Sequence, residues 1–197
     1  MNITAKQIAD LRARTGGGMM DCKKALVEAQ GDAEKAILAL RKSGAIKAAK
    51  KADRETKEGV IGSYIHANGK IGVLVEVLCE TDFVAKNTEF KEFVHDVALH
   101  VAAMNPKYLK SEDVDAKEVA KEKEIFLAEA KASGKPADIA VKIVDGKIKK
   151  FTEESALLCQ PFVKDPSKTI SELLTEKIAK IGENLEIKRF CRFEIGE

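Results

Sequence analysis

The chain has 197 residues, of which 34% are charged and 45% hydrophobic, and its formal net charge is +2. These values are typical of a helix-rich globular protein with room for one well-cored domain and a small additional module. The nearly balanced charge argues against nucleic acid as the main partner, and the low aromatic content of 5%, with no Trp, argues against a base-stacking surface.

The cysteines and histidines predict no metal site and no cofactor. Four cysteines lie far apart with no CxxC pair, which excludes the usual zinc and disulfide patterns and favours a reducing compartment. His95 and His100 lie on one predicted helix, where their spacing turns them about 140° apart, so they cannot bind one metal ion. No stretch has the length of a membrane span and the first residues do not resemble a signal peptide, so we expect a cytoplasmic protein.

Residues 1–50 are predicted to form three short helices. The first begins with a capping box at Thr4 and ends at Gly16, the second spans about 20–29, and the third ends at Gly44. A bundle of this size is too small for an enzyme and is typical of a module that docks on another protein.

The chain then becomes rich in charge. The basic side chains of residues 47–57 could contact RNA phosphates, but acidic residues are interleaved with them, which favours a solvated linker helix. We therefore predict a helical module over 1–50, a charged linker over 51–58 and a core domain over 59–197.

A β-hairpin opens the core domain. Residues 59–66 and 71–79 are β-branched and alternating, and Asn68-Gly69 between them is a strong two-residue turn signal. Both faces of the hairpin are substantially apolar, which indicates packing on each side.

Next comes a corner at residues 81–86, before an amphipathic helix that ends near residue 105. Thr81 can cap the turn through its hydroxyl, and Asp82 favours the positive end of a helix. Phe83 is either buried in the core or displayed, and the periodicity of the sequence leaves both alternatives open.

The remaining chain predicts more helix and one further strand. A charged helix is expected over 112–132, helical surface over 139–158 with a bend near Asp145-Gly146, and a loop over 160–168 fixed by two prolines. A helix follows from a second capping box at Thr169 to Gly182, and the strand over 185–195 would complete a three-stranded antiparallel sheet. One face of that strand is apolar, lined by Leu185, Ile187, Cys191, Phe193 and Ile195. The predicted fold class is therefore α+β, with helices packed on a small sheet.

Four stretches together resemble the bacterial elongation factor Ts family, in the family's order. They read LRARTGGGMMDCKKAL at 11–26, TDFVAKN at 81–87, QPFVKDPSKT at 160–169 and RFCRFE at 189–194. The first two are highly specific. The resemblance implies an N-terminal module similar to ubiquitin-associated domains, an α+β core, and a nucleotide exchange factor that binds elongation factor Tu and releases its GDP.

The resemblance also implies which residues contact the partner. The 81–86 corner would press against the GTPase domain of elongation factor Tu, with Phe83 entering an apolar pocket and Asp82 perturbing the surroundings of the bound Mg²⁺. The residues expected to contact elongation factor Tu are Thr81, Asp82, Phe83, Val84, Ala85, Arg12, Met19 and Met20.

Two departures from the family pattern affect these expectations. Position 17 is Gly where many members have Ala, and the chain resembles the short form, which implies that it lacks a duplicated core subdomain and a coiled-coil insertion. The short form implies a homodimer formed through the sheets, with Cys191 and Phe193 at the interface.

Two other function classes remain as alternatives. An RNA-associated translation or ribosomal factor would use the basic 42–57 segment, whereas an enzyme would need a convergent set of catalytic groups that the sequence does not contain. We expect neither an active site, nor a membrane partner, nor direct nucleic-acid binding.

Overall fold

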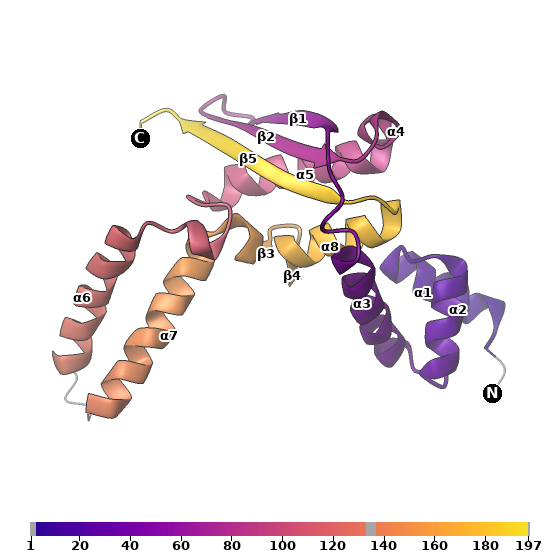
Figure 1. The fold of residues 1–197 in the computed structure, drawn as a ribbon, viewed down its shortest axis with the longest axis horizontal. Coiled ribbons are helices and arrows are strands. Elements are labelled where there is room, and N and C mark those ends of the chain that lie inside the picture. Colours follow the sequence, from indigo (N-terminus) through magenta and orange to yellow (C-terminus); the bar gives the residue numbers. More distant parts are fainter. Residues whose placement is uncertain (1–2, 133–136, 197) are drawn as a thin grey trace. The chain divides into compact units, whose positions relative to one another are not determined.

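The computed structural model describes residues 3–132 and 137–196 and has the predicted α+β class (Figure 1). Its helices within these ranges are α1 (Ala5–Thr15), α2 (Met19–Glu28), α3 (Ala33–Ala49), α4 (Asp82–Lys86), α5 (Thr88–Met104), α6 (Ala116–Ala132), α7 (Ala137–Ser155) and α8 (Ile170–Ile181). Its strands are β1 (Glu58–Ile65), β2 (Ile71–Cys79), β3 (Pro161–Phe162), β4 (Asp165–Thr169) and β5 (Leu185–Glu194). Every helix among the described residues is too short or too polar to cross a bilayer.

The chain divides into two compact units. The first comprises Met1–Gly62, Glu76–Val94 and Glu172–Lys188, and the second comprises the segments between and after them. The division predicted from the sequence, into 1–50, 51–58 and 59–197, stays a prediction.

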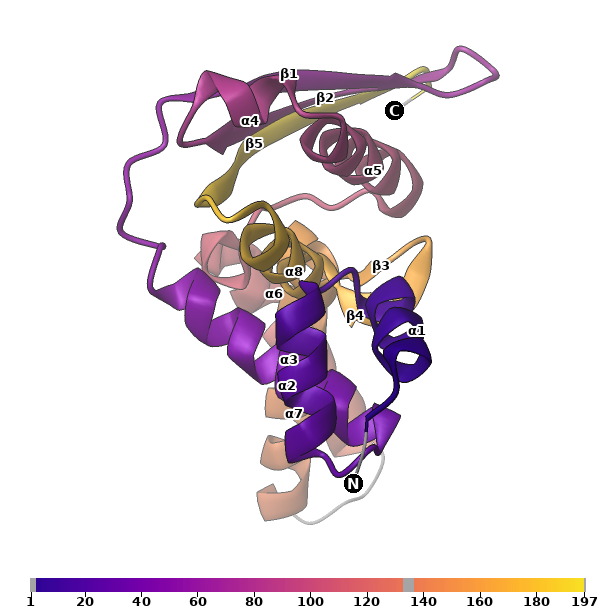
Figure 2. The same cartoon turned by 90° about the vertical axis from the view of Figure 1, so that its right-hand side faces the viewer.

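The first unit contains the predicted three-helix module, whose core is formed by Leu11, Cys22, Ala25, Leu26 and Ala36. The capping box at Thr4 is confirmed, because the Gln7 amide donates to Thr4 Oγ1 at 3.3 Å and the Thr4 amide donates to Gln7 Oε1 at 2.9 Å. α1 ends at Gly16 as predicted. Figures 1 and 2 show α1, α2 and α3 lying against one another.

The third helix does not end at Gly44, as the sequence suggested, but continues to Ala49. A Cβ at Gly44 would lie 3.5 Å from Cβ of Ala179 on α8. This glycine therefore serves close packing of α3 on α8 and is not a helix stop. Residues 50–53 form turns, so the predicted linker helix is also wrong.

β1, β2 and β5 form the predicted three-stranded antiparallel sheet in the order β1-β2-β5. The hairpin turn is where Asn68-Gly69 predicts it, with Gly69 at φ 67°, a left-handed conformation that glycine adopts without strain. One face of β2 is buried through Val73, Val75, Val77 and Cys79, and α5 buries Phe90, Phe93, Val97 and Val101 at helical spacing.

The second unit contains an antiparallel pair of helices, α6 and α7, which lie side by side in Figure 1. Ala130, Ala140 and Val144 form a small core between them, and Lys147 Nζ lies 5.0 Å from the ring centroid of Phe126. Helix was predicted from the sequence over both segments, 112–132 and 139–158, but the pairing of the two helices was not predicted. α7 is a single helix through Gly146, where a bend had been predicted.

The predicted loop over 160–168 is a small two-stranded sheet, because β3 and β4 pair in antiparallel orientation. Pro161 and Pro166 lack the N–H that a central strand needs, but they are compatible with so short a ribbon. Local composition alone cannot reveal a pairing of this length.

His100 on α5 is completely buried in the second unit and anchors this ribbon. The side-chain amide of Gln160 donates to the carbonyl of Glu154 at 2.7 Å, which turns Gln160 Oε1 toward His100 Nε2 at 3.0 Å. The amide of Val163 donates to His100 Nδ1 at 3.2 Å. Both partners are satisfied only by a neutral imidazole that carries its proton on Nε2.

Candidate functional site

The 81–86 corner contains the short helix α4 and connects the end of β2 to α5. Thr81 is its N-cap, as predicted, and its hydroxyl accepts a hydrogen bond from the amide of Val84 at 3.4 Å. The Cys79 thiol donates to the Thr81 carbonyl at 3.2 Å, and burial raises the pKa of this thiol to about 11. Cys79 is therefore a neutral, inert part of the scaffold.

Phe83 is 81% exposed, which decides between the two alternatives that the sequence left open. Its neighbours are progressively less accessible, since Val84 is half-buried and Ala85 is only 8% exposed. Ala85 was predicted to contact the partner, but in this structure its methyl group lies inside the corner. A large apolar ring displayed on a short, capped turn is suited to insertion into an apolar pocket of a partner.

Asp82 is half-buried and forms an ion pair with Lys86, whose Nζ lies 2.6 Å from Asp82 Oδ2. The Lys86 ammonium lowers the pKa of the Asp82 carboxyl, so the group is an anion at neutral pH. Lys86 was not predicted as a site residue, although its spacing of four from Asp82 on a helix is a recognisable signal.

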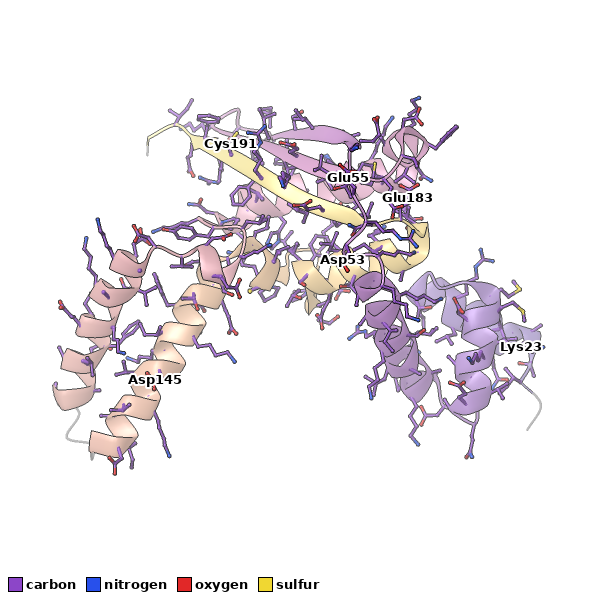
Figure 3. All side chains as sticks on the ribbon, viewed as in Figure 1. Lys23, Asp53, Glu55, Asp145, Glu183 and Cys191 are labelled. Carbon is purple, nitrogen blue, oxygen red and sulfur yellow. The ribbon has the colours of Figure 1, made fainter. Side chains whose placement is uncertain are left out.

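Glu183 accepts hydrogen bonds from the corner and was also missed by sequence analysis. It follows α8 at the turn into β5, where it is labelled in Figure 3. Its Oε2 accepts from the amides of Glu80 and Thr81, both at 3.1 Å, and its Oε1 accepts from the hydroxyl of Thr81 at 2.7 Å. One carboxylate thereby receives the three donors that precede α4.

The predicted contact residues of the N-terminal module are all exposed. Met19 and Met20 open α2, and Arg12 lies on the last turns of α1. Lys180 of α8 lies beside the turn that joins these helices, within 3.4 Å of a Cβ built at Gly16, and it pairs with Glu89 of α5 at 2.5 Å.

In the second unit, β-strand residues and Ile195, directly after β5, expose several apolar side chains, which we call the apolar sheet surface: Ile65, Leu74, Cys191, Phe193 and Ile195. Phe193 is 69% exposed and Cys191 carries a free thiol. Along β5 the burial pattern shifts by one residue after Ile187. The apolar residues predicted to share one face of this strand are therefore buried at its start and exposed at its end.

Among the described residues, no three side chains of His, Cys, Asp or Glu gather in a way that could hold a metal ion. The candidate site is thus composed of a displayed ring, an ion-paired carboxylate and the hydrogen bonds that fix them. Such a set can bind a protein surface, and the groups named here include no nucleophile paired with a base.

Comparison with known proteins identifies the relatives of this chain. A sequence model of the family described as "Elongation factor TS" matches residues 41–197. Curated proteins named elongation factor Ts are similar over almost the whole chain. That of Alkaliphilus metalliredigens is 59% identical over 197 residues, covering 100% of this chain and 91% of the relative. That of Carboxydothermus hydrogenoformans is 56% identical over 195 residues, covering 99% and 90%.

Proposed function

Since the chain belongs to the elongation factor Ts family and is a translation elongation factor, we propose that it is a guanine nucleotide exchange factor for elongation factor Tu. In this proposal it binds elongation factor Tu carrying GDP in the cytoplasm, promotes release of GDP, and leaves when GTP rebinds. It forms no covalent intermediate and has no active site of its own.

The exposed ring of Phe83 is the observation that carries the proposal. Phe83 would enter an apolar pocket of the GTPase domain, and the Asp82 carboxylate beside it would disturb the surroundings of the bound Mg²⁺. Thr81 and Val84 would line the contact, Ala85 would support it from inside, and Arg12, Met19 and Met20 would contact the same domain. Arg12, Met19 and Met20 would form a second contact, separate from that of the 81–86 corner.

Exchange requires only that the factor and GDP weaken each other's binding. By linkage, a factor that binds nucleotide-free elongation factor Tu more tightly than the GDP complex lowers the affinity for GDP by the same ratio. Each ~1.4 kcal/mol of this coupling corresponds to about a tenfold change in affinity.

The direct test is the release of labelled GDP from elongation factor Tu in the presence of a substoichiometric amount of this protein. We expect many GDP molecules released per molecule of factor, because an exchange factor is regenerated when GTP rebinds. Release at the unassisted rate would refute the proposal.

We further propose that the protein is a homodimer formed through the apolar sheet surface, since exposed apolar patches of this kind mark interaction sites. Replacing Phe193 by Lys would place an unpaired charge in that interface and should weaken dimerisation by about 100-fold or more. Sedimentation equilibrium measures the change, and Val141→Lys, at an exposed position of α7, is the matched control.

These measurements should be made with and without reductant, because Cys191 lies on the same surface. Dimers that persist under reduction show that packing suffices without a disulfide. A wild-type protein that is monomeric at all concentrations would remove the dimer proposal.

The alternative of an RNA-associated factor is disfavoured because three of the six basic residues in the 42–57 segment form ion pairs within the protein. Lys47 pairs with Asp21, Arg54 with Glu80, and Lys57 with Glu55. A salt-dependent affinity for RNA, together with no effect on GDP release, would favour the alternative.

A further inference from the structure

We propose that Glu183 is the positioning residue of the 81–86 corner and that the rate of nucleotide exchange depends on it through Phe83. This inference rests on the proposed function, because it assigns the group that holds the ring in place for that exchange.

The Glu183 carboxylate fixes both the backbone and the cap of the corner. Its Oε2 binds the amides of Glu80 and Thr81, which set the direction in which the chain leaves β2. Its Oε1 accepts from the Thr81 hydroxyl. Because the hydroxyl proton is donated to Glu183, a lone pair of Thr81 Oγ1 is free to accept from the Val84 amide. Hydrogen bonds to an ionised carboxylate are about twice as strong as neutral ones, so three of them hold this turn firmly.

Glu183 is itself held in place by its neighbours in the chain. Gly182 before it has φ 91°, a left-handed conformation that ends α8 and turns the chain toward the corner. Asn184 after it is 8% exposed, and its amide donates to Glu80 Oε1 at 2.6 Å. The Asn184 side chain donates to the carbonyl of Arg54 at 2.9 Å.

This arrangement makes the orientation of Phe83 depend on a residue that makes none of the proposed contacts with the partner. Phe83 is the second residue of a five-residue helix, and such a short helix cannot hold its own orientation without external bonds. A supporting residue of this kind affects the rate of a partner reaction by fixing geometry, since small displacements of a contacting group are costly.

The test is a double-mutant cycle on GDP release with Glu183→Ala and Phe83→Ala, measured at a temperature where circular dichroism shows every variant to be folded. We expect Glu183→Ala to reduce the rate of release at saturating factor by about tenfold. In the Phe83→Ala background the same change should have no further effect, because the ring that it positions is gone. Glu186→Ala, at an exposed carboxylate three positions along, is the matched control and should leave the rate unchanged.

Two further measurements separate positioning from general stability. In Glu183→Ala, the amides of Glu80 and Thr81 should lose their protection from hydrogen exchange, which requires no partner protein. Glu183→Gln keeps one acceptor oxygen for these amides, so its loss of exchange rate should be smaller than that of Glu183→Ala.

The outcomes that overturn the inference are distinct from failure of the proposed function. If Phe83→Ala slows release and Glu183→Ala does not, or slows it equally in both backgrounds, Glu183 does not act through Phe83. Unchanged protection of the two amides, or equal losses for the Gln and Ala variants, would also overturn it. If Phe83→Ala does not slow release, both the proposed role of the corner and this inference fail.

Discussion

Phe83→Ala is expected to slow GDP release from elongation factor Tu by about 30-fold, which corresponds to a loss of ~2 kcal/mol, the usual threshold for an interface hot spot. A ring that enters an apolar pocket is desolvated on all sides in the complex, and Ala cannot fill the space that it leaves. The measurement is the rate of labelled GDP release at a fixed, subsaturating concentration of factor.

The same substitution should leave the free energy of unfolding almost unchanged, because Phe83 is 81% exposed in the free protein. Ile125→Ala, which truncates a half-exposed side chain on α6, is a matched control that should alter neither quantity. A large drop in thermal stability of the Phe83 variant would instead show that the ring contributes to the core, and would contradict a role in partner binding.

Most of the local structure at the corner could be predicted from the sequence because its causes are local. A Thr before an Asp at the end of an apolar strand specifies an N-cap, and Thr81 is one. The Asn68-Gly69 turn and the Thr4 capping box were predictable for the same reason, since each depends on residues two or three positions apart. Exposure of Phe83 could not be predicted from periodicity, because one aromatic residue at a corner has none, and only the family resemblance implied it.

The features that sequence analysis missed depend on residues far apart in the chain. Glu183 bonds to Thr81 across a separation of 102 residues, and the type of residue at either position does not indicate its partner. Gly44 is a residue type that commonly ends a helix, but in this structure it allows close packing against Ala179. In both cases the structural role of the residue is determined by contacts with residues distant in the chain, and its local sequence does not indicate that role.

A second large effect is expected at His100, which sequence analysis discounted as a catalytic or metal-binding group. Replacing His100 by Ala should destabilise the second unit by about 2–4 kcal/mol, because it leaves a cavity and removes the partners of Val163 N and Gln160 Oε1. This corresponds to a fall of about 4–16 °C in the temperature of unfolding for a chain of this size. His95→Gln, at an exposed position of the same helix, is the matched control.

His100 should also make the stability of the protein depend on pH. Burial lowers the pKa of this imidazole in the folded state, whereas in the unfolded chain its pKa is about 6.5. Below about pH 6.5 the unfolded state therefore binds more protons, and folding stability decreases by up to ~1.4 kcal/mol per pH unit until the folded-state pKa is reached. Carboxylates whose pKa values are lowered, such as Asp82, lose their contribution to stability only near pH 4 and below.

Urea unfolding at pH 7 and pH 5.5 isolates the histidine contribution. We expect a decrease in stability that is absent in His100→Gln, because Gln does not titrate, and a decrease of the same size in that variant would refute this assignment.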